Sequence, residues 1–194
     1  MKFNPDIHHR RSIRLMEYDY TGGGAYYVTV CAHGRECLFG DVVDEVMRLN
    51  EFGEFVRECW NRIPEHFTDV ILDEYVLMPN HFHGIVIIQQ HRRGDACVAH
   101  GSNGNDDERA RHASPLRSGP SPTSLGAIVG SFKSAVTKLI NQICDNPGCP
   151  VWQRNYFERV IRNDRELAAI REYIINNPQQ WVLDRENPAN HNQA

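Results

Sequence analysis

The stretch YVLMPNHFHGIVII, residues 75–88, predicts a β-hairpin and decides the fold of this chain. Its two apolar halves favour strands, and Pro79 with the asparagine after it favours a turn between them. Side chains alternate between the two faces of a strand, so His81 and His83 point to one face and Phe82 points to the other, where it packs into a core. The hairpin therefore presents two imidazoles side by side, which favours binding of a metal.

The segments around the hairpin complete one α+β domain. Aromatic and β-branched residues predict strands at 25–32, 69–77, 81–88 and about 155–161. Apolar residues at helical spacing predict helices over 44–62, over 124–143 with Ser124 as N-cap, and from Asp164 as cap up to Pro178. This order, β-α-β-β-α-β-α, predicts a ferredoxin-like sandwich, an antiparallel sheet with helices on one face, with an added C-terminal helix.

The length of 194 residues suits one domain with a substantial core. Residues 1–24 are predicted to form a basic N-terminal arm, and residues 25–181 the single domain. Within the domain, residues 91–123 are rich in Gly, Ser and Pro without a sustained period, which predicts a flexible insertion. Residues 182–194 are predicted to form a C-terminal tail.

The composition excludes several classes of protein. The apolar runs are shorter than the roughly 18 to 20 residues of a membrane span, and the N-terminus has no apolar signal-peptide core, so a cytoplasmic protein is expected. The six cysteines form no C-x-x-C pair, which favours reduced thiols over a disulfide framework or zinc knuckle. A net charge of -4 means that any contact with DNA depends on local basic patches.

The C-terminal helix offers partners for the two histidines. Tyr173 and Asn177 are four residues apart, so they project from the same helix face. If this helix packs beside the histidine strand, then His81, His83 and the Asn177 side-chain oxygen form three ligands. Imidazole together with a hard oxygen suits Mg²⁺ or Mn²⁺ better than zinc. Such an ion can polarise a phosphodiester, and Tyr173 is then the candidate nucleophile for a covalent phosphotyrosine intermediate.

These motifs resemble those of the single-tyrosine HUH transposases, in which two histidines flank a hydrophobic residue. The resemblance is greatest to the REP-associated tyrosine transposases. It rests on MPN followed by HFH at 81–83, YIINNP at 173–178, WQRNYFERVIRN at 152–163 and SFKS at 131–134. It covers most of residues 25–181.

The resemblance implies a ferredoxin-like fold and a specific reaction. It implies that His81, His83 and Asn177 hold the metal, and that Tyr173 attacks single-stranded DNA to leave a 5′-phosphotyrosine and a free 3′-OH. The implied substrates are DNA hairpins with flanking recognition bases, such as REP-like elements or insertion-element ends. The chain departs from many relatives at Arg159, where they carry a histidine after the glutamate. The supporting role of that histidine does not carry over.

Several basic residues are candidates for contact with DNA phosphates. The predicted contacts are Arg10, Arg11 and Arg14 of the arm, Lys133 on the second helix, and Arg162, with Lys138 as a further candidate on that helix. Glu158 and Arg162 are lesser candidates for the rim of the site. For the lysines and the arm, a solvated surface is the alternative interpretation.

Other functions stay open at this stage. A domesticated DNA-binding protein that does not cleave would need neither Tyr173 nor the two histidines. A metal-dependent phosphoesterase that activates water would leave Tyr173 dispensable. An RNA-binding ferredoxin-like domain would need more exposed aromatic and basic residues on its sheet. The sequence also leaves open whether two chains cooperate as a homodimer.

Overall fold

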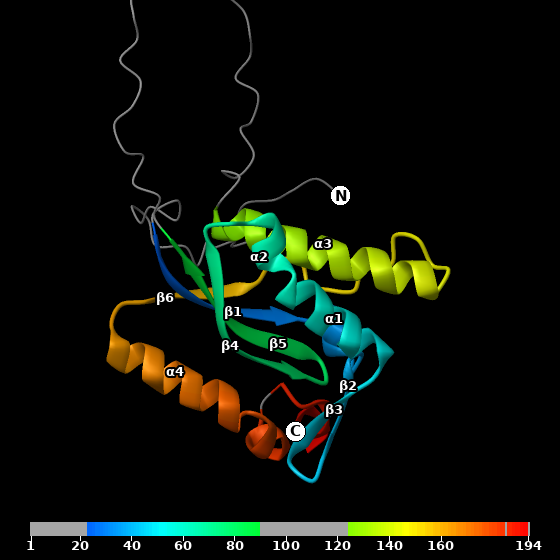
Figure 1. Cartoon of the computed structure of the whole chain (residues 1–194). Helices are drawn as coiled ribbons and strands as arrows, with labels where there is room; N and C mark the ends of the chain where they lie inside the picture. The colour runs from blue at the N-terminus through cyan, green and yellow to red at the C-terminus, as the bar shows by residue number, and fades with distance from the viewer. Residues whose placement is uncertain (1–22, 90–123, 185, 194) are drawn as a thin grey trace, which may run out of the picture.

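The computed structural model describes residues 23–89, 124–184 and 186–193 (Figure 1). Residues 1–22, with Arg10, Arg11 and Arg14, and the predicted insertion at 91–123 therefore lie outside the described residues. The strands are β1 (Gly24–Cys31), β2 (Gly40–Val43), β3 (Val46–Leu49), β4 (Val70–Met78), β5 (His81–Ile88) and β6 (Phe157–Ile161). The α-helices are α1 (Glu51–Asn61), α2 (Ile63–His66), α3 (Leu125–Ile143) and α4 (Asp164–Asn176). The 3₁₀ helices are η1 (His33–Arg35), η2 (Pro178–Leu183) and η3 (Pro188–Gln193).

Four strands form one antiparallel sheet in the order β4-β5-β1-β6. The predicted hairpin is confirmed, since β4 and β5 pair along their length and Met78 lies opposite His81. Strand β5 is internal to the sheet, with β1 on its other side and Thr29 opposite His83. The histidines therefore lie on an internal strand, where hydrogen bonds to two neighbours hold the backbone.

One face of the sheet packs on α1 and α3 around an aromatic core. Phe82 is fully buried there, as predicted, with its ring centroid 4.4 Å from that of Trp60 and 5.4 Å from that of Phe132. Gly84 follows on the same face, and a Cβ on it would lie 2.6 Å from Trp60 Cζ2. Glycine at this position therefore lets the indole ring lie directly on the strand.

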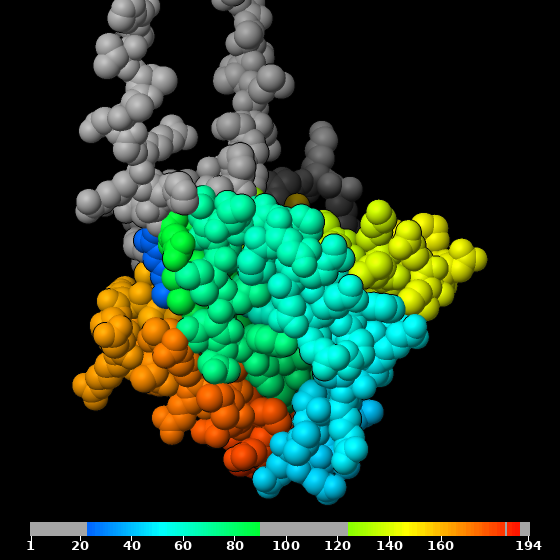
Figure 2. Space-filling view, in the orientation of Figure 1, coloured from blue at the N-terminus to red at the C-terminus, as the bar shows by residue number. Residues whose placement is uncertain are grey.

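Helices α1 and α3 share one face of the sheet, and α4, the added C-terminal helix of the prediction, covers the opposite face (Figure 1). Its buried residue Ile174 packs with Tyr27 of β1 and Ile85 of β5. Outside this contact, Arg171 forms a two-pronged ion pair with Asp73 on β4, at 2.7 and 2.5 Å. Apolar residues on both faces of β5 explain this arrangement, because each face needs its own cover. Figure 2 shows the outer edge of the sheet, in green, between α4 in orange and the helical layer in cyan.

The predicted helix over 44–62 begins later than expected. Residues 40–49 form the hairpin of β2 and β3, and the helix starts at Glu51. Asp44 and Glu45 form the two-residue turn, both with positive φ, which twists the chain as a tight hairpin requires. Asn50 then caps α1 by accepting a hydrogen bond from the Gly53 amide. The apolar residues before position 50 fit a helical spacing, but Met47 and Leu49 instead share the more buried face of strand β3.

The other element boundaries lie close to the prediction. Ser124 caps α3, as expected, by accepting from the Ala127 amide. The last strand begins at Phe157 rather than at about 155. Helix α4 is capped by Asn163 and not by Asp164, because the Asn163 side chain accepts from the Glu166 amide while Asp164 is the first helical residue. Pro178 ends this helix as predicted, and a 3₁₀ helix follows it.

The structure adds two properties of the described segments. Within them, every helix is too short or too polar to cross a membrane. The five cysteines that they include are free thiols.

Candidate functional site

The two histidines of β5 lie side by side under α4. Their ring centroids are 4.6 Å apart, and both side chains are buried. The prediction that they share one face of the sheet is therefore confirmed. Burial in this position makes their hydrogen-bond partners decisive for their chemistry.

Asn80 fixes the orientation of His81. The Asn80 Oδ1 atom lies 2.8 Å from His81 Nδ1, and since an amide oxygen can only accept, Nδ1 carries the proton and donates it. The opposite nitrogen, Nε2, is then unprotonated. It is buried and has no hydrogen-bond partner within the described part of the chain. An unprotonated imidazole nitrogen without a hydrogen-bond partner is able to bind a metal ion.

His83 is held by two hydroxyl groups of β1. Its Nδ1 lies 2.7 Å from Tyr27 Oη and 2.8 Å from Thr29 Oγ1. When Nδ1 donates to either oxygen, Nε2 is again the unprotonated nitrogen. Outer partners of this kind orient metal-binding histidines and set their tautomer.

Helix α4 brings the predicted nucleophile to the same place. The Tyr173 ring centroid lies 5.4 Å from that of His83 and 6.3 Å from that of Tyr27, and 45 % of the residue's surface is exposed. Asn177, one turn later, is buried, and its Oδ1 has no partner among the described residues. The structure thus brings Tyr173, accessible from solvent, beside the two histidines, while Asn177 follows one turn later with its amide oxygen buried.

Burial sets the protonation states in this site. It lowers the pKa of His83 well below the ordinary range, and the neighbouring His81 lowers it further. Burial also lowers the pKa of His81, against the opposing effect of nearby Asp184. The pKa of Tyr173 is raised by burial and by Asp184, while hydrogen bonds with Asn177 and Tyr27 lower it. At neutral pH the site therefore holds two neutral imidazoles and a neutral phenol.

These residues fit a divalent ion. Two buried acceptor atoms, His81 Nε2 and Asn177 Oδ1, lack partners within the described ranges, and a cation would satisfy both. Across those same ranges, no three His, Cys, Asp or Glu side chains converge as a ready-made metal cluster, so the amide of Asn177 is needed as a third ligand. A mixed imidazole and amide-oxygen set suits Mg²⁺ or Mn²⁺.

Comparison with known proteins shows similarity both in sequence and in fold. An uncharacterised protein of Haemophilus influenzae is 41% identical over 184 residues, which cover 95% of this chain and 96% of that protein. This chain belongs to its family. No protein-family model matches the sequence of this chain. The fold of this chain resembles that of the REP-associated tyrosine transposase solved in complex with a REP hairpin, with a TM-score of 0.51 and 16% identity over 87% of this chain and 74% of the other.

The basic residues predicted to contact DNA have different surroundings. Lys133 Nζ lies 2.7 Å from the Gln153 carbonyl oxygen and 3.2 Å from that of Asn155, so its ammonium holds the segment before β6. Arg162 is exposed at the end of β6. Arg159 pairs with Glu166 at 2.9 Å. Contact of Lys133 or Arg162 with DNA stays a prediction.

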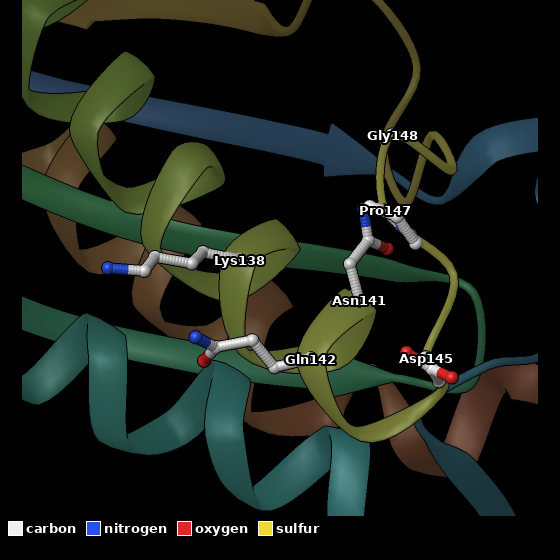
Figure 3. A pocket seen from close by; sticks show the side chains of 6 residues that line it. All are labelled: Lys138, Asn141, Gln142, Asp145, Pro147 and Gly148. Carbon is white, nitrogen blue, oxygen red and sulfur yellow. The ribbon is translucent and has the colours of Figure 1, made fainter.

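A separate cavity lies at the C-terminal end of α3. It has a volume of about 440 Å³ and is lined by Lys138, Asn141, Gln142, Asp145, Pro147 and Gly148 (Figure 3). Asn141 points toward Pro147, whereas Lys138 and Gln142 extend to the other side. Contact of Lys138 with phosphate stays a prediction.

Three residues around the site were missed by sequence reasoning. Tyr26 and Tyr27 point to opposite faces of the first strand. Pairing that strand with the histidine strand would have placed Tyr27 beside His83. Asn80 was assigned only a turn, although it directly precedes His81. Asp184 fell in the predicted tail, yet its Oδ2 lies 3.9 Å from His81 Nε2. No local pattern marks Asp184, because its approach depends on the path of the chain after Pro178.

Proposed function

We propose that this protein is a metal-dependent enzyme that cleaves and rejoins single-stranded DNA through a phosphotyrosine, as a tyrosine transposase of the REP-associated type. We also propose that its four-stranded sheet is the ferredoxin-like sandwich of that group, with α4 as the added helix that carries the tyrosine. The strand order β4-β5-β1-β6 with antiparallel neighbours supports this topology.

The proposal depends chiefly on one observation: an exposed tyrosine lies against a buried histidine pair, and His81 of that pair has a buried nitrogen without a hydrogen-bond partner among the described residues. A packing tyrosine would not need the orphaned Nε2 of His81 and Oδ1 of Asn177 beside it, because burying such atoms without a partner costs about 1–3 kcal/mol each. A DNA-binding protein without cleavage would gain nothing from this cost. The arrangement is explained if His81, His83 and Asn177 hold a divalent ion.

The residues then divide the chemistry between them. When bound, a Mg²⁺ or Mn²⁺ ion supplies Lewis-acid polarisation of the scissile phosphodiester. The Tyr173 oxygen attacks phosphorus and loses its proton, while the 3′ oxygen leaves and gains one, so the products are a 5′-phosphotyrosine and a free 3′-OH. The reverse attack by a 3′-OH rejoins a strand without an external energy source. The Tyr173 ring packs edge-on against the rings of Tyr27 and His83, which keeps the phenol near the imidazoles.

The proposed substrate is a single-stranded DNA hairpin. The fold neighbour was solved with a REP hairpin, and the exposed Tyr173 and Arg162 leave a strand access to the site. Arg10, Arg11, Arg14 and Lys133 stay proposed contacts to the DNA backbone.

The test is an assay for a covalent protein–DNA adduct on denaturing gels. Hairpins taken from the DNA flanking the gene are incubated with the full chain and Mn²⁺ or Mg²⁺. We expect an adduct that requires the metal and disappears in Tyr173→Phe. The matched control is Tyr75→Phe, which removes a phenol from the opposite face of the sheet, where Tyr75 packs on Trp60 and Phe82.

Two results would contradict the proposal in different ways. Cleavage without an adduct, equal in Tyr173→Phe and wild type, would indicate a phosphoesterase that uses activated water. Hairpin binding without cleavage at any metal concentration would indicate a domesticated DNA-binding protein.

A further inference from the structure

We infer that Asp184 is a carboxylate ligand of the metal, supplied by the C-terminal segment from the His81 side of the site. This inference rests on the proposed function for the existence of the metal site. It adds a ligand that lies beyond the motif residues His81, His83 and Asn177.

The first support is the distance between Asp184 and His81. The Asp184 Oδ2 atom lies 3.9 Å from His81 Nε2, which is too far for a hydrogen bond. Two ligands that each bind one ion at about 2.1 Å lie between about 3.0 Å apart at right angles and about 4.2 Å apart when opposite. The observed separation falls inside this interval, so an ion between the two atoms could contact both, although His81, His83 and Asp184 do not form a ready-made cluster without it among the described residues.

The second support is the way in which the carboxylate is held. The Oδ1 atom of Asp184 accepts a hydrogen bond from the Glu186 amide at 2.7 Å, which leaves Oδ2 to face the histidine. The Asp184 carbonyl oxygen in turn accepts from the Asn190 side chain at 2.8 Å. A side chain fixed at one oxygen and directed by the other loses little further freedom on binding an ion.

The third support is the attachment of this segment to the histidine hairpin. Asn80, which fixes His81 through its Oδ1, uses its amide nitrogen to donate to the carbonyl oxygen of Glu186 at 2.7 Å. Arg35 adds an ion pair to Glu186 at 3.1 Å. One asparagine therefore sets both the free nitrogen of His81 and the position of the segment that carries Asp184.

Charge supplies the fourth support. The ligands His81, His83 and Asn177 are all neutral, so they would leave a dication uncompensated in a largely buried site. Hard divalent ions are held in proteins by one or more carboxylates. Only 14% of the Asp184 side chain is exposed, and it provides the negative charge on the side of the site where His81 Nε2 is bare.

The test measures Mn²⁺ binding without DNA, from the loss of the free Mn²⁺ signal in electron paramagnetic resonance. Full-length wild type is compared with Asp184→Asn and with Asp145→Asn, a matched change at an exposed carboxylate of the α3 cavity. In Asp184→Asn the Glu186 amide still needs an acceptor, so the new NH₂ group takes the place of Oδ2 and faces His81. We expect affinity for Mn²⁺ to fall at least about 10-fold in Asp184→Asn and to stay unchanged in Asp145→Asn.

The outcomes separate this inference from the proposed function. If wild type binds Mn²⁺, and His83→Gln loses that binding while Asp184→Asn keeps wild-type affinity, then the metal site stands and the role of Asp184 is overturned. If wild type binds no Mn²⁺ even at millimolar concentration, both ideas are overturned. An equal loss in Asp184→Asn and Asp145→Asn would point to general surface charge and would also overturn the inference.

Discussion

Replacing Gly84 with alanine should destabilise the fold from within the histidine strand. Gly84 lies between His83 and Ile85, on the face that packs against Trp60. A Cβ at this position would lie 2.6 Å from Trp60 Cζ2, 2.8 Å from Phe82 Cε1 and 2.9 Å from Trp60 Cη2. Carbon atoms in contact are normally about 3.5–4.0 Å apart. Either the strand or the indole ring must therefore move by several tenths of an ångström.

The indole ring has little freedom to move. Trp60 is fully buried, and its ring centroid lies 5.3 Å from that of Phe132 and 6.1 Å from that of Tyr75. Overpacking of such a core costs about 1–3 kcal/mol. For a domain of this size, a loss of that magnitude lowers the melting temperature by roughly 2–12 °C. Because the adjacent residue is His83, we also expect weaker Mn²⁺ binding.

The control is the same substitution at Gly130 of α3. Nothing lies within 4 Å of a Cβ at Gly130, and the residue is exposed in the helix. Gly130→Ala should therefore stabilise the protein by about 0.5–1 kcal/mol through helix propensity. Denaturant unfolding followed by circular dichroism measures both free energies. Equal stability of the Gly84→Ala and Gly130→Ala proteins would refute the close packing of Trp60 on the histidine strand.

Three further predictions concern the site and its support. Tyr27→Phe should slow adduct formation by roughly 10-fold, whereas Tyr26→Phe should not change the rate. Of these two tyrosines, only Tyr27 has a hydroxyl that bonds to His83 and interacts with Tyr173, and a hydrogen bond of this kind contributes about 1.5 kcal/mol. Equal rates of the two variants in a single-turnover gel assay would contradict this prediction. Burial lowers the pKa of His83, so below about pH 6.5 this histidine binds a proton in the unfolded chain but not in the folded chain. The free energy of unfolding should therefore decrease as the pH falls, and it should decrease less steeply in His83→Gln. Thermal melts from pH 8 to 5.5 measure both slopes. Asp73→Asn removes the ion pair that joins β4 to α4, so hydrogen exchange of α4 amides should accelerate while that of α3 stays constant; unchanged exchange in α4 would show that its apolar contacts suffice.

The sequence predicts those parts of the fold that depend on local periodicity. Strand β5 and helix α3 lie where alternation and helical spacing place them, since each buries a complete apolar face. The four residues His81, His83, Tyr173 and Asn177 could be grouped because each pair has a fixed offset within one regular element.

Prediction was less successful where a few backbone torsion angles control the chain. Aspartate at position 44 is compatible with positive φ, but Glu45 stands where a two-residue hairpin turn usually has glycine, so the turn between β2 and β3 left only a weak signature. The face covered by α4 followed only on the condition that this helix packs beside the histidine strand. Periodicity identifies an amphipathic helix but does not say which side of the sheet receives it, and here the burial of Ile85 on the face opposite Phe82 decides the side.

The donor atoms of the candidate site come from parts of the chain that are distant in sequence. His81 and His83 lie on β5, Asn177 ends α4, and Asp184 lies in the segment after η2. An unfolded chain has no such arrangement, so binding of a metal here would add directly to the free energy of unfolding. The cost of burying the unpartnered Nε2 and Oδ1 atoms is borne by the rest of the fold until a cation satisfies them. The packing of α4 and the attachment of Asp184 through Asn80 and Glu186 are therefore part of the site's chemistry, since they fix the positions of the donor atoms to which one ion would bind.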